Sequence, residues 1–365
     1  MIANHDAVRQ EWPEVNLLSL QITANWHRPT SIREADLGNV LRGAFGVVFR
    51  KLVCPPNWFN NDCALCPLYS QCPYGQVFRP TPSGDATRMR KQADLPRPFV
   101  IRPQLHSDMI GSGERDNHVL NFGIVLFGKA IDALPHFMVT LNELGRVGMG
   151  PSRTPFSITS VHSIIPGASA YESLYDPTSN EMRRPERLIL KKHLLGLEPM
   201  NSDLQQEIDF QTPTLLRTGS GVVPDGRRIA AREIVGAPPF GVLIRRLRDR
   251  LSSLCAFFAD EEWHRDDFGE LGRLADEVEL LEEATAWQHR SRRSTRTGQS
   301  HELSGFTGKA TYRFPSQSHL NSLLPLVRYG ELIHVGKNVV WGNGRIELLA
   351  SQSEICGFGE ETPTS

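Results

Sequence analysis

Hydrophobic and polar residues alternate over residues 18–26, which predicts a strand with one buried face. Asp36 is suited to cap a helix N-terminus, and apolar residues then recur at helical spacing as far as Leu52. The first half of the chain is therefore expected to place a helix directly after its first strand.

The same periodicities continue along the first half. Apolar residues predict two strands, at 99–101 and 120–126. Helical spacing over 130–144 predicts a second helix, and a last strand is expected from Phe156. The polar, proline-containing segment from Pro80 to Pro96 is expected to be a loop. The resulting order, βαββαβ, is that of the ferredoxin-like split motif.

The second half of the chain repeats this order. Its main predicted elements are a strand at 208–216, a helix at 240–258, a strand at 305–314, a helix at 320–329 and a strand at 346–349. An acidic segment at 260–283 is expected to end in a solvated helix, followed by a weak strand near Ala286. Each half has a glycine-rich loop before its last strand, which indicates an internal duplication.

These patterns predict an α+β fold made of two tandem ferredoxin-like, RRM-like domains. The N-terminal domain is expected to span residues 1–185, with a cysteine-rich insertion at about 54–96, and the C-terminal domain residues 186–365. The length of 365 residues supports this division, because roughly 150 residues make one domain.

Composition and charge narrow the class of protein. Hydrophobic residues make up 39% and charged residues 22%, as in folded globular proteins. No apolar run approaches the roughly 18 residues of a membrane span, and the opening residues lack a signal-peptide pattern, so a cytoplasmic protein without membrane contacts is expected. The formal net charge is −1, so any contact with nucleic acid has to come from locally clustered charge.

Four of the six cysteines lie within nineteen residues of sequence. They are Cys54, Cys63, Cys66 and Cys72. Four thiolates at such spacing suit a structural zinc ion, and an iron–sulfur cluster is conceivable. A closed shell of four thiolates leaves no open coordination position, so such a metal would be structural. The alternative is that these cysteines are buried and bind nothing.

A glycine-rich loop spans residues 334–345. Glycines let the backbone approach a ligand, exposed amides bind phosphate, and Lys337 and Arg345 supply positive charge. It is not a Walker A loop, because Asn338 replaces the Ser or Thr that would hold magnesium. The alternatives are a plain turn with two solvated cations, or the nucleotide site of a metabolic enzyme.

Two further features carry candidate chemistry. Residues 290–296 contain four arginines and no acid, which suits RNA phosphates and unstacked bases, although a solvated basic turn has the same composition. His27 follows the first predicted strand, and His334 opens the glycine loop. Each suits a general acid or base, and each also suits a structural role.

Taken together, these segments resemble the RAMP superfamily of CRISPR-associated proteins and, in detail, its repeat-processing endoribonucleases, the sixth Cas family. The matching segments are Leu41 to Gly46, Cys72 to Phe78, Gly145 to Arg153, Thr212-Pro213 with Pro239-Phe240, Arg290 to Arg296, Gly305 to Gly308 and His334 to Arg345. They cover nearly the whole chain in the expected order.

The resemblance implies an endoribonuclease that cleaves CRISPR precursor RNA within its repeats without a catalytic cofactor, leaving a 2′,3′-cyclic phosphate and a 5′-hydroxyl. The family uses a histidine near the first helix, but residues 37–52 contain none, so His27 is the expected base, with Arg42 and Lys51 as phosphate partners. The implied RNA-binding residues are Arg290, Arg292, Arg293, Gly336, Lys337, Gly342, Gly344 and Arg345. The implied partners are repeat RNA and other CRISPR effector subunits. A non-catalytic RAMP subunit that binds guide RNA is the alternative.

Overall fold

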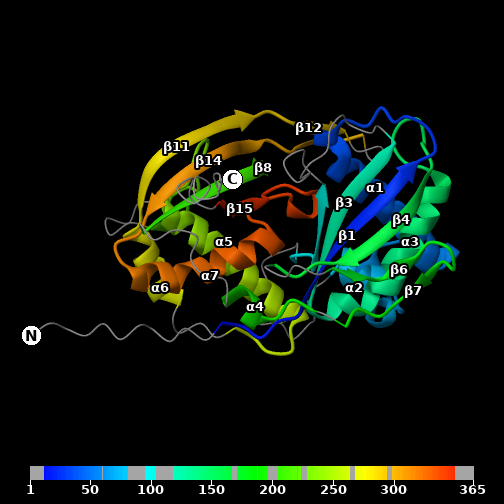
Figure 1. Ribbon diagram of the computed structural model, residues 1–365, viewed down its shortest axis with the longest axis horizontal. Helices are drawn as coiled ribbons and strands as arrows, with labels where there is room; N and C mark the ends of the chain where they lie inside the picture. Colours follow the sequence, from blue (N-terminus) through cyan, green and yellow to red (C-terminus); the bar gives the residue numbers. More distant parts are fainter. Residues whose placement is uncertain are drawn as a thin grey trace, which may run out of the picture.

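The computed structural model describes residues 12–349, except 60, 81–94, 104–117, 167–170, 187, 196–203, 220, 223–227, 264–267 and 294–297. Most of the predicted loop from Pro80 to Pro96 lies outside the described residues. The two halves of the chain form two lobes, each with a sheet and its own helices (Figure 1).

The sheet of the first lobe has the strand order β2-β3-β1-β4-β5, and all its pairs are antiparallel. Its elements are β1 (Leu17–Trp26), α1 (Glu34–Val53), α2 (Pro73–Phe78), β2 (Phe99–Pro103), β3 (Val119–Phe127), α3 (Leu134–Val147), β4 (Phe156–Ser163) and β5 (Glu172–Ser173). β1 lies between β3 and β4, and Ile22 and Ala24 on its apolar face belong to the same buried cluster as residues of α1 and α3. The first four strands have the order of a ferredoxin-like split motif.

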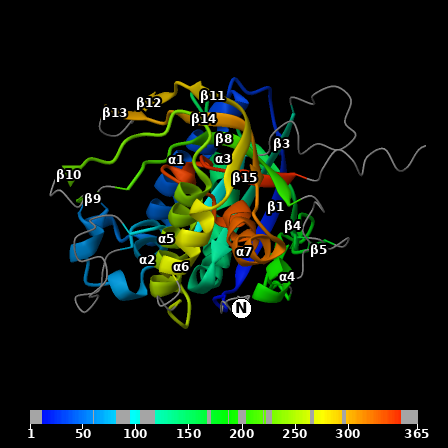
Figure 2. The same ribbon diagram turned by 90° about the vertical axis from the view of Figure 1, so that its left-hand side faces the viewer.

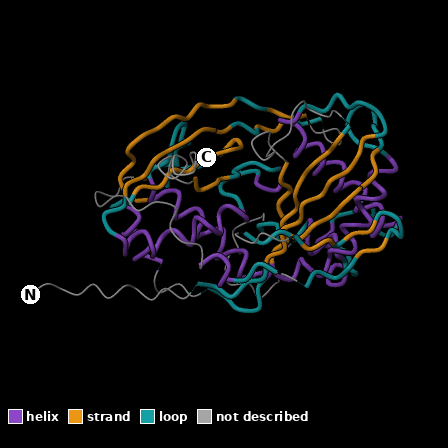
Figure 3. Tube along the Cα trace, viewed as in Figure 1, coloured by secondary structure: helices purple, strands orange, loops and turns teal. Residues whose placement is uncertain are grey.

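The second lobe repeats this arrangement with the order β11-β14-β8-β15. Its elements are β8 (Gln205–Thr214), α5 (Phe240–Phe258), α6 (Phe268–Asp276), β11 (Glu279–Gln288), β14 (Gly305–Arg313), α7 (Gln317–Ile333) and β15 (Ile346–Leu349). Figure 3 shows the curved sheet lying over the helices of this lobe. The predicted tandem ferredoxin-like fold is confirmed.

Short strands and one short helix lie between and beside the elements of these two motifs. They are β6 (Tyr175–Asp176), β7 (Glu181–Met182), α4 (Lys191–Leu195), β9 (Gly221–Val222), β10 (Arg228–Ile229), β12 (Ser291–Arg293) and β13 (Ser300–Glu302). β12 and β13 pair as a hairpin. Among the helices of the described residues, none combines the length and the apolar composition needed to cross a bilayer.

The acidic segment differs from its prediction. Helix α6 ends at Asp276, and residues 279–283 already belong to strand β11. β11 lies at the edge of the sheet and pairs with β14, so its three glutamates stay exposed while the side of the strand that faces β14 is hydrogen-bonded. The glutamates therefore hid the strand pattern, and β11 begins at Glu279, well before the strand predicted near Ala286.

The two lobes share buried contacts. Val100, Val125 and Phe127 of the first sheet face away from α1 and belong to the same apolar cluster as the helices of the second lobe. In the other direction, Val339 and Val340 of the glycine-rich loop are buried in the core of the first lobe. The loop of one lobe therefore completes the core of the other, and the two lobes are held at a fixed orientation.

Candidate functional site

His27 lies at the end of β1, on the loop that leads into α1, and its side chain is exposed. Its Nε2 is 2.7 Å from the hydroxyl oxygen of Ser157 on β4. Its backbone N–H donates to the carbonyl oxygen of Pro155 at 3.0 Å, which fixes the loop against the last strand of the sheet. The imidazole is thus held in one orientation at the rim of a sheet face, where it can reach a bound polymer.

Arginine side chains lie in the loop that carries this histidine and in the glycine-rich loop against it. The Arg28 guanidinium donates to the carbonyl oxygen of Ser152 at 2.8 Å, so it lies against the glycine-rich loop of the first lobe. Arg153 in that loop has a positive φ of 45°, an uncommon conformation for a residue other than glycine. Both arginine side chains are exposed. This loop therefore offers positive charge beside His27.

The basic hairpin β12–β13 reaches from the second lobe to the start of α1. Arg290 Nη1 donates to the carbonyl oxygen of Ala35, and Arg292 Nη1 donates to Oδ1 of Asn39, each at 3.2 Å. Figures 1 and 2 show this hairpin projecting beyond the strands of the second sheet, near α1. Arg293 lies on β12 as well. Arg290 and Arg292 of the predicted arginine cluster therefore lie against the first turns of α1, the helix that follows the loop carrying His27.

Arg42 lies between the two lobes. Its guanidinium carbon is 5.0 Å from the ring centroid of Phe78 and 5.7 Å from that of Trp341, and Arg292 stacks on the same Trp341 at 4.0 Å. Burial, together with the nearby Arg97, lowers the pKa of Arg42 to about 10, so the group stays charged at neutral pH. Two guanidinium groups and one indole thus join the domains by cation–π contacts.

Lys51 is exposed near the end of α1. It follows Arg42 by nine residues, which in a helix is about 13 Å along the axis and on the opposite side. The structure therefore does not bring Arg42 and Lys51 to one place, and their roles as phosphate partners stay predictions. Arg28 is the cation that the structure places next to His27.

The glycine-rich loop of the second lobe is mostly buried. Gly342, Gly344 and Arg345 are buried, and Nη1 of Arg345 points to the carbonyl oxygen of Pro103 in the first lobe at 3.5 Å. Gly336 is half-buried, whereas the Lys337 side chain is exposed. Of the residues predicted to bind RNA in this loop, Lys337 presents its charge to solvent.

His334 is fully buried. Its Nδ1 is 3.0 Å from the carbonyl oxygen of Asn343, and burial, together with Arg102, holds the pKa of the imidazole well below its ordinary value. The ring is therefore neutral at physiological pH and donates to that carbonyl. This geometry gives His334 a structural role in shaping the glycine-rich loop.

Replacing Lys337 with alanine is expected to weaken binding of repeat RNA without changing stability, because the side chain is exposed. The slope of log affinity against log salt should fall in magnitude by about 1, the effect of one lost phosphate contact. Lys309→Ala is the matched control, since Lys309 forms an ion pair with Glu207 at 3.0 Å on the open face of the second sheet. Equal losses for both variants in filter binding would contradict a specific contact by Lys337.

Three contributors to this region were not predicted from the sequence: Ser157, Arg28 and Trp341. Ser157 follows the glycine loop by a few residues, but only the register of β4 on β1, which pairs Ser157 with Asn25, brings it to His27. Arg28 is adjacent to His27 in sequence, and that adjacency was a usable signal. Trp341 lies inside the glycine-rich segment, and its large apolar side chain was a signal that could have predicted a packing contact there.

The four cysteines of the insertion line one cavity beside the C-terminal end of α1. Burial raises the pKa of the Cys63 thiol, against a smaller lowering by Arg50 and Arg79. No group of three or more His, Cys, Asp or Glu side chains in the described part of the chain is placed to share a single metal ion. Structural zinc at these thiols stays a prediction.

Two consecutive split βαβ units have the same strand order, and a glycine-rich loop of the second packs against the first; the chain therefore has tandem ferredoxin-like domains. Comparison with known proteins narrows this class. Residues 208–346 match the family model described as CRISPR-associated endoribonuclease Cas6, and residues 15–187 match a model described only as an N-terminal domain. The C-terminal half of the chain is thus similar to the Cas6 family, and the resemblance to the CRISPR repeat-processing family is confirmed.

The chain is also similar over most of its length to a curated protein and to a solved structure. An uncharacterized protein of Archaeoglobus fulgidus is 27% identical over 331 residues, which covers 89% of this chain and 97% of that protein. The fold is similar to that of a Thermus thermophilus Cas6 solved as a product complex, with a TM-score of 0.52 and 15% identity over 91% of this chain and 100% of the other.

Proposed function

We propose that this protein is a metal-independent endoribonuclease that cleaves CRISPR precursor RNA within its repeats. The single observation that carries the proposal is the placement of His27. This exposed imidazole is hydrogen-bonded to Ser157 and is followed by Arg28, on the loop that leads into α1, and Arg290 and Arg292 of the second lobe contact the first turns of that helix. A Cas6 family domain in the same chain supports RNA as the substrate.

The chemistry follows from the hydrogen bond of His27. When Nε2–H donates to the Ser157 hydroxyl, the other ring nitrogen, Nδ1, carries the free electron pair. Nδ1 then removes the proton from a ribose 2′-hydroxyl, whose oxygen attacks the adjacent phosphorus. The bond from phosphorus to the 5′-oxygen breaks, and that oxygen takes up a proton. The products are a 2′,3′-cyclic phosphate and a 5′-hydroxyl.

The distribution of charge favours one path for the RNA. On the open face of the second sheet, the register places Asp209 of β8 beside Glu347 of β15, and Glu207 lies two residues before Asp209 on the same face. This acidic face repels a phosphate backbone. Arg290 contacts the Ala35 carbonyl of the first lobe, and Lys337 precedes Asn338, which donates to the Glu302 carbonyl of the hairpin, so both cations lie near the junction of the lobes. The strand is expected to follow that junction.

Purified protein incubated with the host's repeat RNA in EDTA is expected to cut the RNA at one position. End-group analysis should find a product that resists phosphatase until acid opens its cyclic phosphate, together with a 5′-hydroxyl that a kinase labels. A 3′-hydroxyl product, or cleavage that requires added magnesium, would contradict the mechanism. Binding without cleavage would favour the alternative, a non-catalytic RAMP subunit that binds guide RNA within a complex of CRISPR effector subunits.

A further inference from the structure

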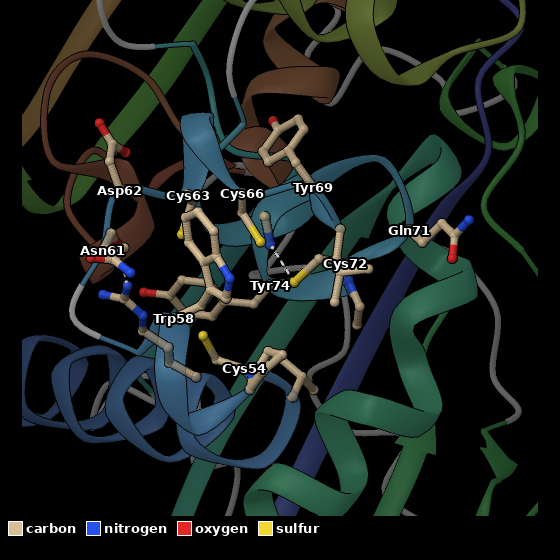
Figure 4. Close-up of a pocket in the computed structure, with 16 residues that line it drawn as sticks. Cys54, Trp58, Asn61, Asp62, Cys63, Cys66, Tyr69, Gln71, Cys72 and Tyr74 are labelled. Atoms are coloured by element: carbon tan, nitrogen blue, oxygen red, sulfur yellow. Dashed lines mark hydrogen bonds between the residues drawn. The ribbon is translucent and has the colours of Figure 1, made fainter.

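The cysteine-rich insertion and the end of α1 line a cavity of about 210 Å³ that is partly open to solvent. Cys54, Cys63, Cys66 and Cys72 all line it, and Figure 4 shows their sulfur atoms facing the same space from different segments of the loop. All four thiols are half-buried and unpaired in disulfides. Such an arrangement of four thiols is typical of a ligand set.

Local backbone structure holds each thiol in place. Cys54 ends α1, and its N–H donates to the Arg50 carbonyl. Cys63 begins a 3₁₀ turn that Asp62 caps, and the N–H of Cys66 donates to the Cys63 carbonyl at 3.1 Å. Cys72 caps the N-terminus of α2, where its sulfur accepts the N–H of Gly75 at 3.5 Å. Backbone N–H donors to cysteine sulfur stabilise the thiolate form that binds metal.

The cavity offers more room than a single ion fills. Zinc–sulfur bonds of about 2.3 Å bring four tetrahedral thiolates to within roughly 3.8 Å of one another. No three ligand side chains among the described residues are placed to share one ion, although all four thiols reach the same cavity. A water molecule takes up about 30 Å³ in the liquid, so this cavity holds the volume of several waters, more than one ion fills.

A cuboidal cluster fits these observations. Each thiolate binds a different iron at a corner of the core, so the sulfurs of the four cysteines stand apart around an inorganic centre. Proline follows three of the four cysteines, as Pro55, Pro67 and Pro73, and a cysteine followed by proline also occurs in known iron–sulfur ligand runs. The wall includes Trp58 and Tyr74, whose rings shield such a centre from water.

Charge in the cavity wall agrees with an anionic centre. A [4Fe–4S] core held by four thiolates is negatively charged. Arg50 lines the cavity and is fixed there by a hydrogen bond to the Asn61 carbonyl at 2.7 Å and by stacking 5.2 Å above the Phe59 ring. Its positive charge offsets that of the cluster.

We propose that Cys54, Cys63, Cys66 and Cys72 bind a [4Fe–4S] cluster that fastens the insertion to α1. Two of the ligands cap helices, Cys54 at the end of α1 and Cys72 at the start of α2, so the cluster joins these helices through the intervening loop. Phe78 of α2 stacks on Arg42, so the cluster also supports the aromatic contact between the lobes.

Metal analysis of the intact chain, purified without oxygen, tests this proposal. About four iron and four acid-labile sulfide per chain are expected, with a broad visible absorption that dithionite bleaches. Stoichiometric zinc without iron, or no metal at all, would overturn it. These measurements are independent of RNA cleavage, so they are separate from the test of the proposed function.

Variants locate the ligands. Cys66→Ser is expected to lose at least half of the bound iron and to lower the melting temperature. Cys255→Ser is the matched control, because Cys255 is buried in α5 of the other lobe, and it should keep full iron and sulfide. Equal iron in the two variants would overturn the assignment of ligands, even if both proteins fold.

Discussion

Replacing His27 with alanine is expected to lower the rate of RNA cleavage by about 10²–10⁴-fold, the usual contribution of a general base. Affinity for repeat RNA should stay within a few-fold of the native value, because the arginines and lysines expected to contact phosphate remain. The fold should also be unaffected, since the side chain is exposed and packs against no core residue. Single-turnover cleavage and gel-shift binding of the same samples measure the two effects separately.

The control for this substitution is His136→Ala. His136 is also exposed, but it lies on α3, the helix that packs on the opposite face of the first sheet. Its loss should leave both cleavage and binding unchanged. Native cleavage by His27→Ala would remove His27 from the mechanism and point to another group at the junction of the lobes.

Replacing Gly344 with alanine is expected to lower the free energy of unfolding by about 3 kcal/mol or more. Gly344 has a φ of 72°, and a Cβ there would lie 1.8 Å from the carbonyl oxygen of Val335, to whose N–H the Gly344 carbonyl is also bonded. The backbone conformation costs roughly 1–3 kcal/mol for a residue with a side chain, and the overpacking costs a similar amount. Urea denaturation monitored by tryptophan fluorescence measures the change.

Gly43→Ala is the matched control, because a Cβ at Gly43 of α1 meets no atom within 4 Å. Alanine should stabilise that helix by up to about 1 kcal/mol. If Gly344→Ala kept native stability but lost RNA binding, the glycine would serve the RNA directly. The structure predicts the reverse: the folded fraction of this variant should bind RNA normally through Lys337 and the hairpin arginines.

These expectations change how the glycine-rich loop is interpreted. Its glycines were predicted to bring the backbone close to RNA, but the close approach in the structure is to protein. A Cβ on Gly342 would lie 2.6 Å from the Pro103 side chain of the other lobe. The glycines of this loop thus allow the contact between the domains, and Lys337 remains exposed on the loop.

The sequence by itself determined the order of elements and the tandem fold, because alternating and helical spacing of apolar residues depends on local backbone geometry. It also determined which side chains can carry charge, ligate a metal or move a proton. The extent of β11 was missed, since the partner strand that satisfies its backbone is about thirty residues away.

Only the tertiary structure decided which of these residues act together. Ser157 contacts His27, which is 130 residues away in the sequence, and Arg292 contacts Asn39, which is 253 residues away. Arg42 and Lys51, although on the same helix, lie on opposite sides of it. Such contacts depend on strand register and on the packing of one lobe against the other. No local pattern encodes them, because residues distant in the chain become neighbours only when the core is buried.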